Sequence, residues 1–459
     1  MSDSKVKRYG VIGAARSGLA VARLLRSEGK DVLVSDRRPA SEMPSAVEFL
    51  QSIGARFELG AHTEALFDND EIVLSPGVPD TIPIVVEARR RGITITNELE
   101  VAARRCRGEI VAITGTNGKT TTTELSGHIF RMAGRKTWVA GNVGVPFSEI
   151  APMTTQDDVV VVEASSFQLE HIETFHPRVA VILNVTPDHM DRYAAFEDYV
   201  AAKERITMRQ TDHDMLIYNI DDPVLRGLSS KSRAYPLALS IETDVEAGAF
   251  LRKGMLILRF PSSTDREFEE VHLMRREEIA IRGPHNLYNA MAAALAARAL
   301  GVQVDAIREG LATFAGVPHR LESVGEVDGV RFVNDSKATN VNSLWYALQS
   351  FSEPIVLIAG GRSKRNQYGT VLPLLRQHVR AVVLIGEAAD EMEKAFSGIV
   401  ATYRAGFSLE EAMRIARELA LPNDIVLLSP ACASFDMFEN YEHRGDVFKA
   451  IVRELRMKN

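Results

Sequence analysis

Short apolar runs alternate with helical stretches over the first part of the chain. Residues 9–12, 31–35 and 72–74 are mostly apolar and have the length of buried strands. The intervening stretch that ends at Ser27 has helical character, and Gly29 is typical of a helix end. Strands that alternate with helices predict a doubly wound unit, and such units bind ligands beyond the carboxyl ends of their strands.

The same rhythm continues through the rest of the chain. Residues 159–162 are four consecutive valines, which is the pattern of a strand buried on both faces. Helices are expected at 119–133, 196–210 and 285–299, and residues 215–281 are expected to hold short alternating strands. Further strands are expected at 109–113, 137–140, 158–163, 179–183, 331–334, 355–359, 381–385 and 425–428.

These elements predict an α/β fold of three domains, in agreement with 459 residues at ~150 residues per domain. We expect a Rossmann-like N-terminal domain at 1–97, a central domain of P-loop type at 98–316 and a Rossmann-like C-terminal domain at 317–459. Parallel α/β structure is expected in all three.

Composition narrows the class of protein. The chain is 46% apolar and 25% charged, as in globular proteins with full cores. A net charge of −7 without a basic tract disfavours a nucleic-acid partner. Cys106 and Cys432 make neither a disulfide framework nor a metal motif. The N-terminus lacks an apolar signal core and no run approaches ~18 apolar residues, so we expect a cytoplasmic protein with no membrane span. A monomer is also expected.

The segment 112–121 carries the most specific chemistry. An apolar strand enters a turn with Gly115, Thr116, Asn117 and Gly118, and Lys119, Thr120 and Thr121 open a helix. The backbone N–H groups and the helix dipole suit a phosphate, Lys119 can reach the outer phosphates, and Thr120 can ligate Mg²⁺. The loop is shorter than G-x-x-x-x-G-K-[ST], and the alternative is a plain glycine turn.

A second glycine turn occupies 13–18. Ala15 stands where a dinucleotide fingerprint has its second glycine, which makes NAD doubtful. Asp36, Arg37 and Arg38 end the next strand and suit a ribose, a uracil or a mononucleotide, although an unliganded α/β unit stays open.

Polar side chains also follow the later strands. Glu163 ends the valine strand, where nucleotide folds place a Mg²⁺ ligand. His189 follows the next strand, and Lys203 would ordinarily be a solvated cation. Arg320 and the segments 334–340, 360–364 and 428–434 predict a cationic, hydroxyl-lined crevice that suits a dicarboxylate, although helix capping explains some of these residues.

Taken together, these motifs resemble the muramyl ligase family over essentially the whole chain. Residues 114–120 mark the wider family, which includes folylpolyglutamate synthetases. Residues 334–340, 428–436 and 440–445 resemble the members that add D-glutamate, and 163–170 and 184–193 also match. The resemblance implies uridine-nucleotide, ATPase and amino-acid domains.

The implied reaction belongs to peptidoglycan precursor synthesis. The carboxylate of UDP-N-acetylmuramoyl-L-alanine would attack the γ-phosphate of ATP, and D-glutamate would attack the acyl phosphate, with Mg²⁺ neutralising charge. The resemblance aligns Lys203 with a lysine that carries CO₂ as a carbamate, an anion able to bridge Mg²⁺.

The resemblance also assigns roles to single residues. The catalytic group comprises Lys119, Glu163, His189, Lys203 and Arg320. The metals are assigned to Thr120, Glu163, His189 and carbamylated Lys203. ATP is assigned to the loop Gly115, Thr116, Asn117, Gly118, Lys119, Thr120 and Thr121 and to Asn286, Arg320, Asp335 and Lys337. The uridine substrate is assigned to Ser17, Asp36, Arg37, Arg38, Gly77, Asn142, Asp188 and His189. D-Glutamate is assigned to Thr339, Lys364, Ser434 and Tyr441.

Three alternatives stay open at this stage. They are a related ligase with a folate or another amino acid as substrate, a nucleotide-binding regulator without chemistry, and a nicotinamide oxidoreductase.

Overall fold

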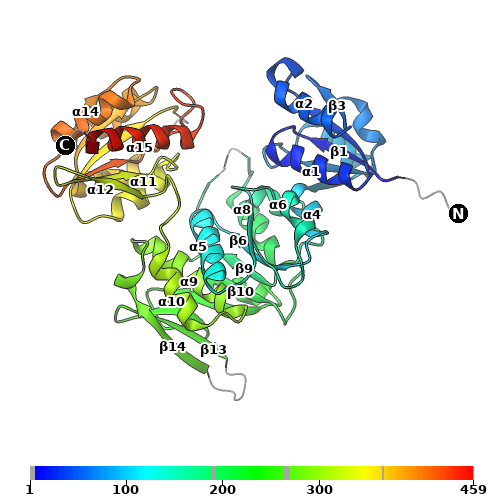
Figure 1. The fold of residues 1–459 in the computed structure, drawn as a ribbon, viewed down its shortest axis with the longest axis horizontal. Helices are drawn as coiled ribbons and strands as arrows, with labels where there is room; N and C mark the ends of the chain where they lie inside the picture. Colours follow the sequence, from blue (N-terminus) through cyan, green and yellow to red (C-terminus); the bar gives the residue numbers. More distant parts are fainter. Residues whose placement is uncertain (1–5, 189, 191, 262–267, 364–365, 458–459) are drawn as a thin grey trace. The chain divides into compact units, whose positions relative to one another are not determined.

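The computed structural model describes residues 6–188, 190, 192–261, 268–363 and 366–457. The chain forms two compact units, residues 1–279 with 288–314 and residues 280–287 with 315–459. The first unit holds two sheets and the second holds one (Figure 1). The α/β fold class is confirmed. Within the described residues, none of the helices is both long and apolar enough to cross a membrane.

The N-terminal sheet is fully parallel and has the strand order β3-β2-β1-β4-β5. Its strands are β1 (Arg8–Ile12), β2 (Asp31–Asp36), β3 (Arg56–Leu59), β4 (Glu71–Leu74) and β5 (Thr94–Asn97). Its helices are α1 (Arg16–Ser27), α2 (Pro44–Ser52) and α3 (Pro83–Arg90), and α4 (Glu98–Ala103) leads into the next sheet. The order reverses at β1, so ligands are expected beyond the ends of β1 and β4.

The central sheet has nine strands in the order β14-β13-β12-β11-β10-β9-β6-β8-β7. Their bounds are β6 (Glu109–Thr114), β7 (Thr137–Gly141), β8 (Val159–Glu163), β9 (Val179–Ile182), β10 (Met215–Asn219), β11 (Tyr235–Ser240), β12 (Gly248–Arg252), β13 (Met255–Pro261) and β14 (Phe268–Arg275). The helices are α5 (Lys119–Met132), α6 (Phe147–Ile150), α7 (Ser166–Leu169), α8 (Phe196–Glu204), α9 (Pro284–Ala299) and α10 (Val304–Thr313).

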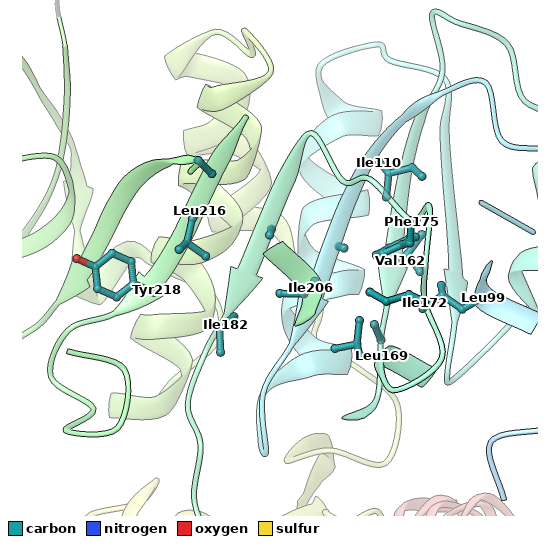
Figure 2. Close-up of a cluster of buried hydrophobic side chains, with 14 of the residues drawn as sticks. Leu99, Ile110, Val162, Leu169, Ile172, Phe175, Ile182, Ile206, Leu216 and Tyr218 are labelled. Atoms are coloured by element: carbon teal, nitrogen blue, oxygen red, sulfur yellow. The ribbon is translucent and has the colours of Figure 1, made fainter. Parts of the chain in front are cut away.

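The valine strand β8 lies between β6 and β7 and is buried along its whole length, as its composition predicts. Side chains on one face of this sheet pack with α4 and the segments after β8 (Figure 2). Val162, Ile182 and Leu216 come from neighbouring parts of the sheet, and Phe175 and Leu99 lie at the Val162 end of the cluster, beside Val162 and Ile172. This core fixes the strand ends from which the polar loops emerge.

The C-terminal sheet has the order β15-β16-β20-β17-β18-β19. Its strands are β15 (Glu322–Val327), β16 (Val330–Asn334), β17 (Ile355–Gly360), β18 (Val379–Ile385), β19 (Ala401–Arg404) and β20 (Ile425–Leu428). Helices α11 (Val341–Gln349), α12 (Leu372–His378) and α13 (Ala389–Phe396) pack on one face, and α14 (Leu409–Leu419) and α15 (Tyr441–Met457) pack on the other.

The expectation of parallel structure throughout is wrong at two places. Strands β12, β13 and β14 pair antiparallel, and β15 pairs antiparallel with β16. Two-residue turns connect β12 to β13 at Lys253–Gly254 and β15 to β16 at Asp328–Gly329, with positive φ at all four residues. Asp-Gly is a strong hairpin signal because both central residues of this turn need positive φ, so the second hairpin was readable from the sequence.

Candidate active site

The phosphate loop connects the end of β6 to the start of α5. Gly115 and Gly118 have φ values of 149° and 85°, which favour glycine because a Cβ is strained there. Lys119 Nζ donates to the carbonyl oxygens of Gly115 and Thr116 at 2.9 and 2.8 Å. The loop therefore has the turn, the helix N-terminus and the cation that bind phosphate in such folds.

Asn184, which follows β9, fixes this loop from the neighbouring strand. Its Oδ1 accepts from the Asn117 N–H at 2.9 Å, its Nδ2 donates to the Asn117 carbonyl at 3.1 Å, and its carbonyl accepts from the Thr116 N–H at 2.9 Å. Asn289 on α9 accepts from Thr122 Oγ1 at 3.1 Å. No role was predicted for Asn289, whose one signal in the sequence is a polar residue within an Ala-rich helix.

Lys203 lies at the same loop rather than on a solvated face. It is 1% exposed, and its Nζ donates to the Gly115 carbonyl at 2.9 Å. Nζ also lies 4.5 Å from the centre of the Tyr199 ring. Burial, followed by the charge of Lys119, lowers the pKa of Lys203 well below its ordinary value. Two lysines therefore share one carbonyl, and burial disfavours the charged form of Lys203.

Glu163 and Asn142 meet at the ends of β8 and β7. Asn142 Nδ2 donates to Glu163 Oε1 at 3.1 Å, and the Asn142 N–H donates to the Glu163 carbonyl at 2.9 Å. The carboxylates of Asp188 and Glu163 both favour the charged form of Lys203. The structure thus brings Lys119, Asn142, Glu163, Asp188 and Lys203 together. His189 lies outside the described residues, and Asn286 belongs to the other compact unit.

The chemistry of these residues fits ATP and a hard cation. Asn117 Nδ2 and Thr121 Oγ1 are buried at the loop without a hydrogen-bond partner among the described residues, which suits an added polar ligand. No group of three or more His, Cys, Asp or Glu side chains that could hold a metal occurs in that part of the chain. A Mg²⁺ held by Glu163 and Thr120 would therefore need further oxygen ligands.

A second candidate site lies in the N-terminal domain, where a pocket of about 200 Å³ opens at the carboxyl ends of β1, β2 and β4. The pocket is lined by Ile12, Gly13, Asp36, Arg37, His62, Gly77, Val78, Pro79 and Ile82. Asp36, Arg37 and Gly77 were expected here. Arg38 turns back onto Asp36, and Ser17 lies in α1. His62 had not been predicted.

Arg192 connects this region to the central domain. Its guanidinium donates to the carbonyl oxygens of Pro76 and Val78 at 3.1 and 3.4 Å, and it lies 3.9 Å from the centre of the Phe167 ring. No role was predicted for Arg192, although it lies in the segment 184–193 that also contains His189.

In the C-terminal domain, the polar segments follow neighbouring parallel strands. Asp335 follows β16, and its Oδ2 accepts from Ser429, which follows β20, at 2.8 Å. Burial raises the pKa of Asp335 to about 7, against the opposing effects of the Ser429 bond and the Arg320 charge. Arg320 Nε is buried without a partner among the described residues, so a guanidinium hydrogen is available for an anion.

Arg444 joins these segments from α15. It is 1% exposed, and its guanidinium donates to Ser336 Oγ at 2.9 Å, to the Ser336 carbonyl at 2.8 Å and to the Cys432 carbonyl at 3.2 Å. Burial lowers the pKa of Arg444 to about 10. Its bonds fix the loop after β16 against the loop after β20, a role that was not predicted.

The remaining predicted residues lie as follows. Lys337 Nζ is 5.4 Å from the centre of the Tyr441 ring, and the Thr339 N–H donates to the Lys337 carbonyl at 2.9 Å. Ser434 is buried in the loop after β20. Asn286 Nδ2 donates to the Arg282 carbonyl at 2.7 Å. Lys364 lies outside the described residues.

Comparisons with known families cover each part of the chain. Residues 7–97 match the Mur ligase MurD-like N-terminal domain, residues 113–297 match the Mur ligase middle domain, and residues 319–432 match the Mur ligase glutamate ligase domain. Solved structures share the fold. They include the UDP-N-acetylmuramate-alanine ligase MurC of Thermotoga maritima (TM-score 0.60, 20% identity, 99% of this chain and 100% of that chain). MurF of the same organism in complex with ADP is also similar (TM-score 0.60, 17% identity, 100% of both chains).

Full-length relatives are more similar in sequence. A UDP-N-acetylmuramoylalanine--D-glutamate ligase of Salinibacter ruber is 49% identical over 99% of this chain and 100% of the relative. The protein of the same name from Chloroherpeton thalassium is 42% identical over 99% of both chains. The resemblance to muramyl ligases is thus confirmed: the chain belongs to the Mur ligase family.

Proposed function

We propose that this protein is an ATP-dependent ligase that joins D-glutamate to UDP-N-acetylmuramoyl-L-alanine in peptidoglycan precursor synthesis. The phosphate loop with its two converging lysines carries the proposal, because it supplies the ATP half of the reaction. The full-length relatives, which are named for this reaction, support the choice of substrates. We extend the proposal to a cytoplasmic, monomeric enzyme with domains at 1–97, 98–316 and 317–459.

The reaction needs two displacements. A carboxylate oxygen of the uridine substrate attacks the γ-phosphorus of ATP and ADP leaves. The amine of D-glutamate then attacks the acyl carbon, an amide forms, and phosphate and a proton leave. The loop N–H groups and Lys119 hold the phosphates in line for the first step. Mg²⁺, when bound at Thr120, Glu163 and His189, neutralises charge on the phosphates.

Lys203 would serve this site as a carbamate. A neutral lysine nitrogen can attack CO₂, forming an N–C bond and losing a proton, and burial favours that neutral amine. The product is an anion whose oxygens suit Mg²⁺, whereas an ammonium would repel both the metal and Lys119. We expect Lys203→Ala to lose activity while still binding ATP, and labelled CO₂ to be incorporated in the parent protein only.

The C-terminal domain would supply the amino-acid end. Arg320, Asp335 and Lys337, with Asn286, are proposed to contact ATP, and the buried Arg320 Nε without a partner among the described residues supports an anion there. Hydroxyl and cationic side chains suit the two carboxylates of D-glutamate. They are Thr339, Lys364, Ser434 and Tyr441.

The N-terminal pocket would hold the uridine end of the substrate, with Asp36, Arg37 and Gly77 at its wall and Ser17 and Arg38 nearby. Asn142 and Asp188 would line the path of the muramoyl part, because Asn142 bonds to Glu163 and the charge of Asp188 acts on Lys203.

Release of ADP with UDP-N-acetylmuramoyl-L-alanine tests the proposal when D-glutamate, L-glutamate and L-lysine are compared as acceptors. We expect D-glutamate to give amide and stoichiometric ADP, and the two L-amino acids to give little product. Comparable amide from L-lysine would overturn the assignment. Nucleotide binding with no substrate-dependent ADP release would instead indicate a regulator.

A further inference from the structure

Two adjacent aspartates, Asp221 and Asp222, follow strand β10, and the proposed function gives them no role. Strand β10 pairs parallel with β9, which pairs parallel with β6, so the carboxyl ends of all three lie at one edge of the sheet (Figure 1). The phosphate loop follows β6. The two carboxylates therefore lie at the edge of the sheet from which this loop emerges.

Asp222 connects its own turn to a distant backbone N–H group. Its Oδ1 accepts from the Val224 N–H at 2.9 Å, which is a local turn bond, and its Oδ2 accepts from the Val185 N–H at 2.8 Å, 37 positions away in the chain. Val185 is 2% exposed. Because a buried N–H needs a partner, loss of the carboxylate would force the backbone at Val185 to move or to admit water.

The backbone at Val185 matters because both of its neighbours contact the phosphate loop. Asn184 makes two bonds to the backbone of Asn117 through its side chain. The Thr186 N–H donates to Thr116 Oγ1 at 3.0 Å, and this hydroxyl donates to the Thr186 carbonyl at 3.1 Å. The segment 184–186 is therefore tied to the loop through its outer residues and to Asp222 through its middle one.

Asp221 makes a corresponding connection to helix α9. Its Oδ2 accepts from the Tyr288 hydroxyl at 2.6 Å and from the Ile241 N–H at 2.8 Å, and its Oδ1 accepts from Ser240 Oγ at 2.7 Å. Burial and the Asp221 bond raise the pKa of Tyr288, so its hydroxyl keeps the proton that it donates. Asn289, the next residue of α9, bonds to α5 just after the phosphate loop.

We propose that Asp221 and Asp222 are positioning residues for ATP, which set helix α9 and segment 184–186 against the phosphate loop. The inference rests on the proposed ATP-dependent function. The bonds of both carboxylates come from backbone N–H groups and hydroxyls, so each carboxylate acts as an acceptor that holds distant segments together. The loop binds phosphate only when its N–H groups converge, and the groups that support the loop therefore set its affinity.

Calorimetric binding of ATP with Mg²⁺ to the full chain tests this role, with urea unfolding as the measure of stability. Asp222→Ala should bind ATP at least about tenfold more weakly, the effect of misplacing one donor to a phosphate. It should bind UDP-N-acetylmuramoyl-L-alanine as the parent protein does. Asp222→Asn keeps one acceptor oxygen and should recover part of the ATP affinity. Tyr288→Phe removes only a hydroxyl and should bind ATP about threefold to tenfold more weakly.

Asp158→Ala is the matched control. Asp158 is also a buried carboxylate, and it accepts from the Thr155 N–H at 3.2 Å and from Trp138 Nε1 at 2.7 Å. It precedes β8 and so lies at the amino edge of the same sheet, away from the phosphate loop. Asp158→Ala should unfold at lower urea concentration than the parent protein but bind ATP normally.

The positioning role would be overturned, while the proposed function stood, if folded Asp222→Ala and Tyr288→Phe both bound ATP within about twofold of the parent protein. An equal loss of ATP affinity in Asp158→Ala would also overturn it, because general destabilisation would then be sufficient. If Asp222→Ala does not fold, Asp222→Asn and Tyr288→Phe decide the question by the same criterion. A parent protein that binds no ATP would overturn the proposed function itself.

Discussion

Replacing Gly118 with alanine should separate the stability of helix α5 from its nucleotide binding. Gly118 precedes the helix with φ 85°, and Gly134 follows its other end with φ 73°. Alanine at either position would be strained by the positive φ, which costs about 1–2 kcal/mol of stability. The two sites differ in their surroundings, so Gly134→Ala is a matched control on the same helix.

The surroundings set the size of the difference. A Cβ at Gly118 would lie 2.4 Å from Asn289 Oδ1 and 3.0 Å from Leu183 Cδ1, whereas at Gly134 it would meet no atom within 4 Å. Asn289 cannot simply swing away, because it is buried and its Oδ1 accepts from Thr122. Overpacking of this kind costs about 1–3 kcal/mol, in addition to the φ term.

The loop would relieve this overlap by shifting, and its N–H groups would no longer point at the phosphates together. Each hydrogen bond to a charged group contributes about 1.5–3 kcal/mol, so loss of one weakens ATP binding by about 10- to 150-fold. We expect Gly118→Ala to show this loss in calorimetry and a lower free energy of unfolding in urea. Gly134→Ala should lose only about 1–2 kcal/mol of stability and bind ATP normally.

Two results would refute the reasoning. One is ATP binding by folded Gly118→Ala within about twofold of the parent protein, because the close contact with Asn289 would then not position the loop. The other is an equal loss of ATP affinity in Gly134→Ala, because strain at either end of α5 would then be sufficient.

Three further predictions concern the lysine of the loop and two buried groups of the C-terminal domain. Lys119→Ala should fold normally but release ADP about 10²–10³-fold more slowly, and near-normal turnover would disprove the role of this loop. Lys231→Ala, at a mostly exposed position, is the control and should keep its activity. Burial raises the pKa of Asp335 to about 7, compared with about 4 in an unfolded chain. The folded protein therefore holds the proton more tightly, which stabilises it fully below about pH 4. This stabilisation is lost as the pH rises through 7. Urea unfolding should therefore show the parent protein losing free energy over that window, relative to Asp335→Asn, by at most about 1.4 kcal/mol per pH unit; parallel profiles would contradict the assignment. Arg444→Met should lower the free energy of unfolding by about 2–4 kcal/mol because it leaves buried carbonyls unpaired. Arg453→Met, on the exposed side of the same helix, should change it little, and similar losses in both variants would contradict a stabilising role for the Arg444 hydrogen bonds.

The sequence alone determined the features that depend on neighbouring residues. The phosphate loop is contiguous, since its strand, glycines, lysine and helix follow each other and its donors are backbone N–H groups. Strand ends were also readable, because parallel strands place their following loops at one edge of a sheet. For this reason Glu163 could be placed at the end of its strand, and Lys119 at the start of its helix, before the fold was known.

The tertiary structure decided which polar groups meet in the interior. Nothing near Asp36 in the sequence indicates that Ala14 joins Arg38 in donating to its carboxylate, and nothing near Arg444 indicates bonds to Ser336 and Cys432. A buried polar group must find a partner, but any of several distant groups can satisfy it. Packing of the sheets and helices makes that choice, so it cannot be read from a local pattern.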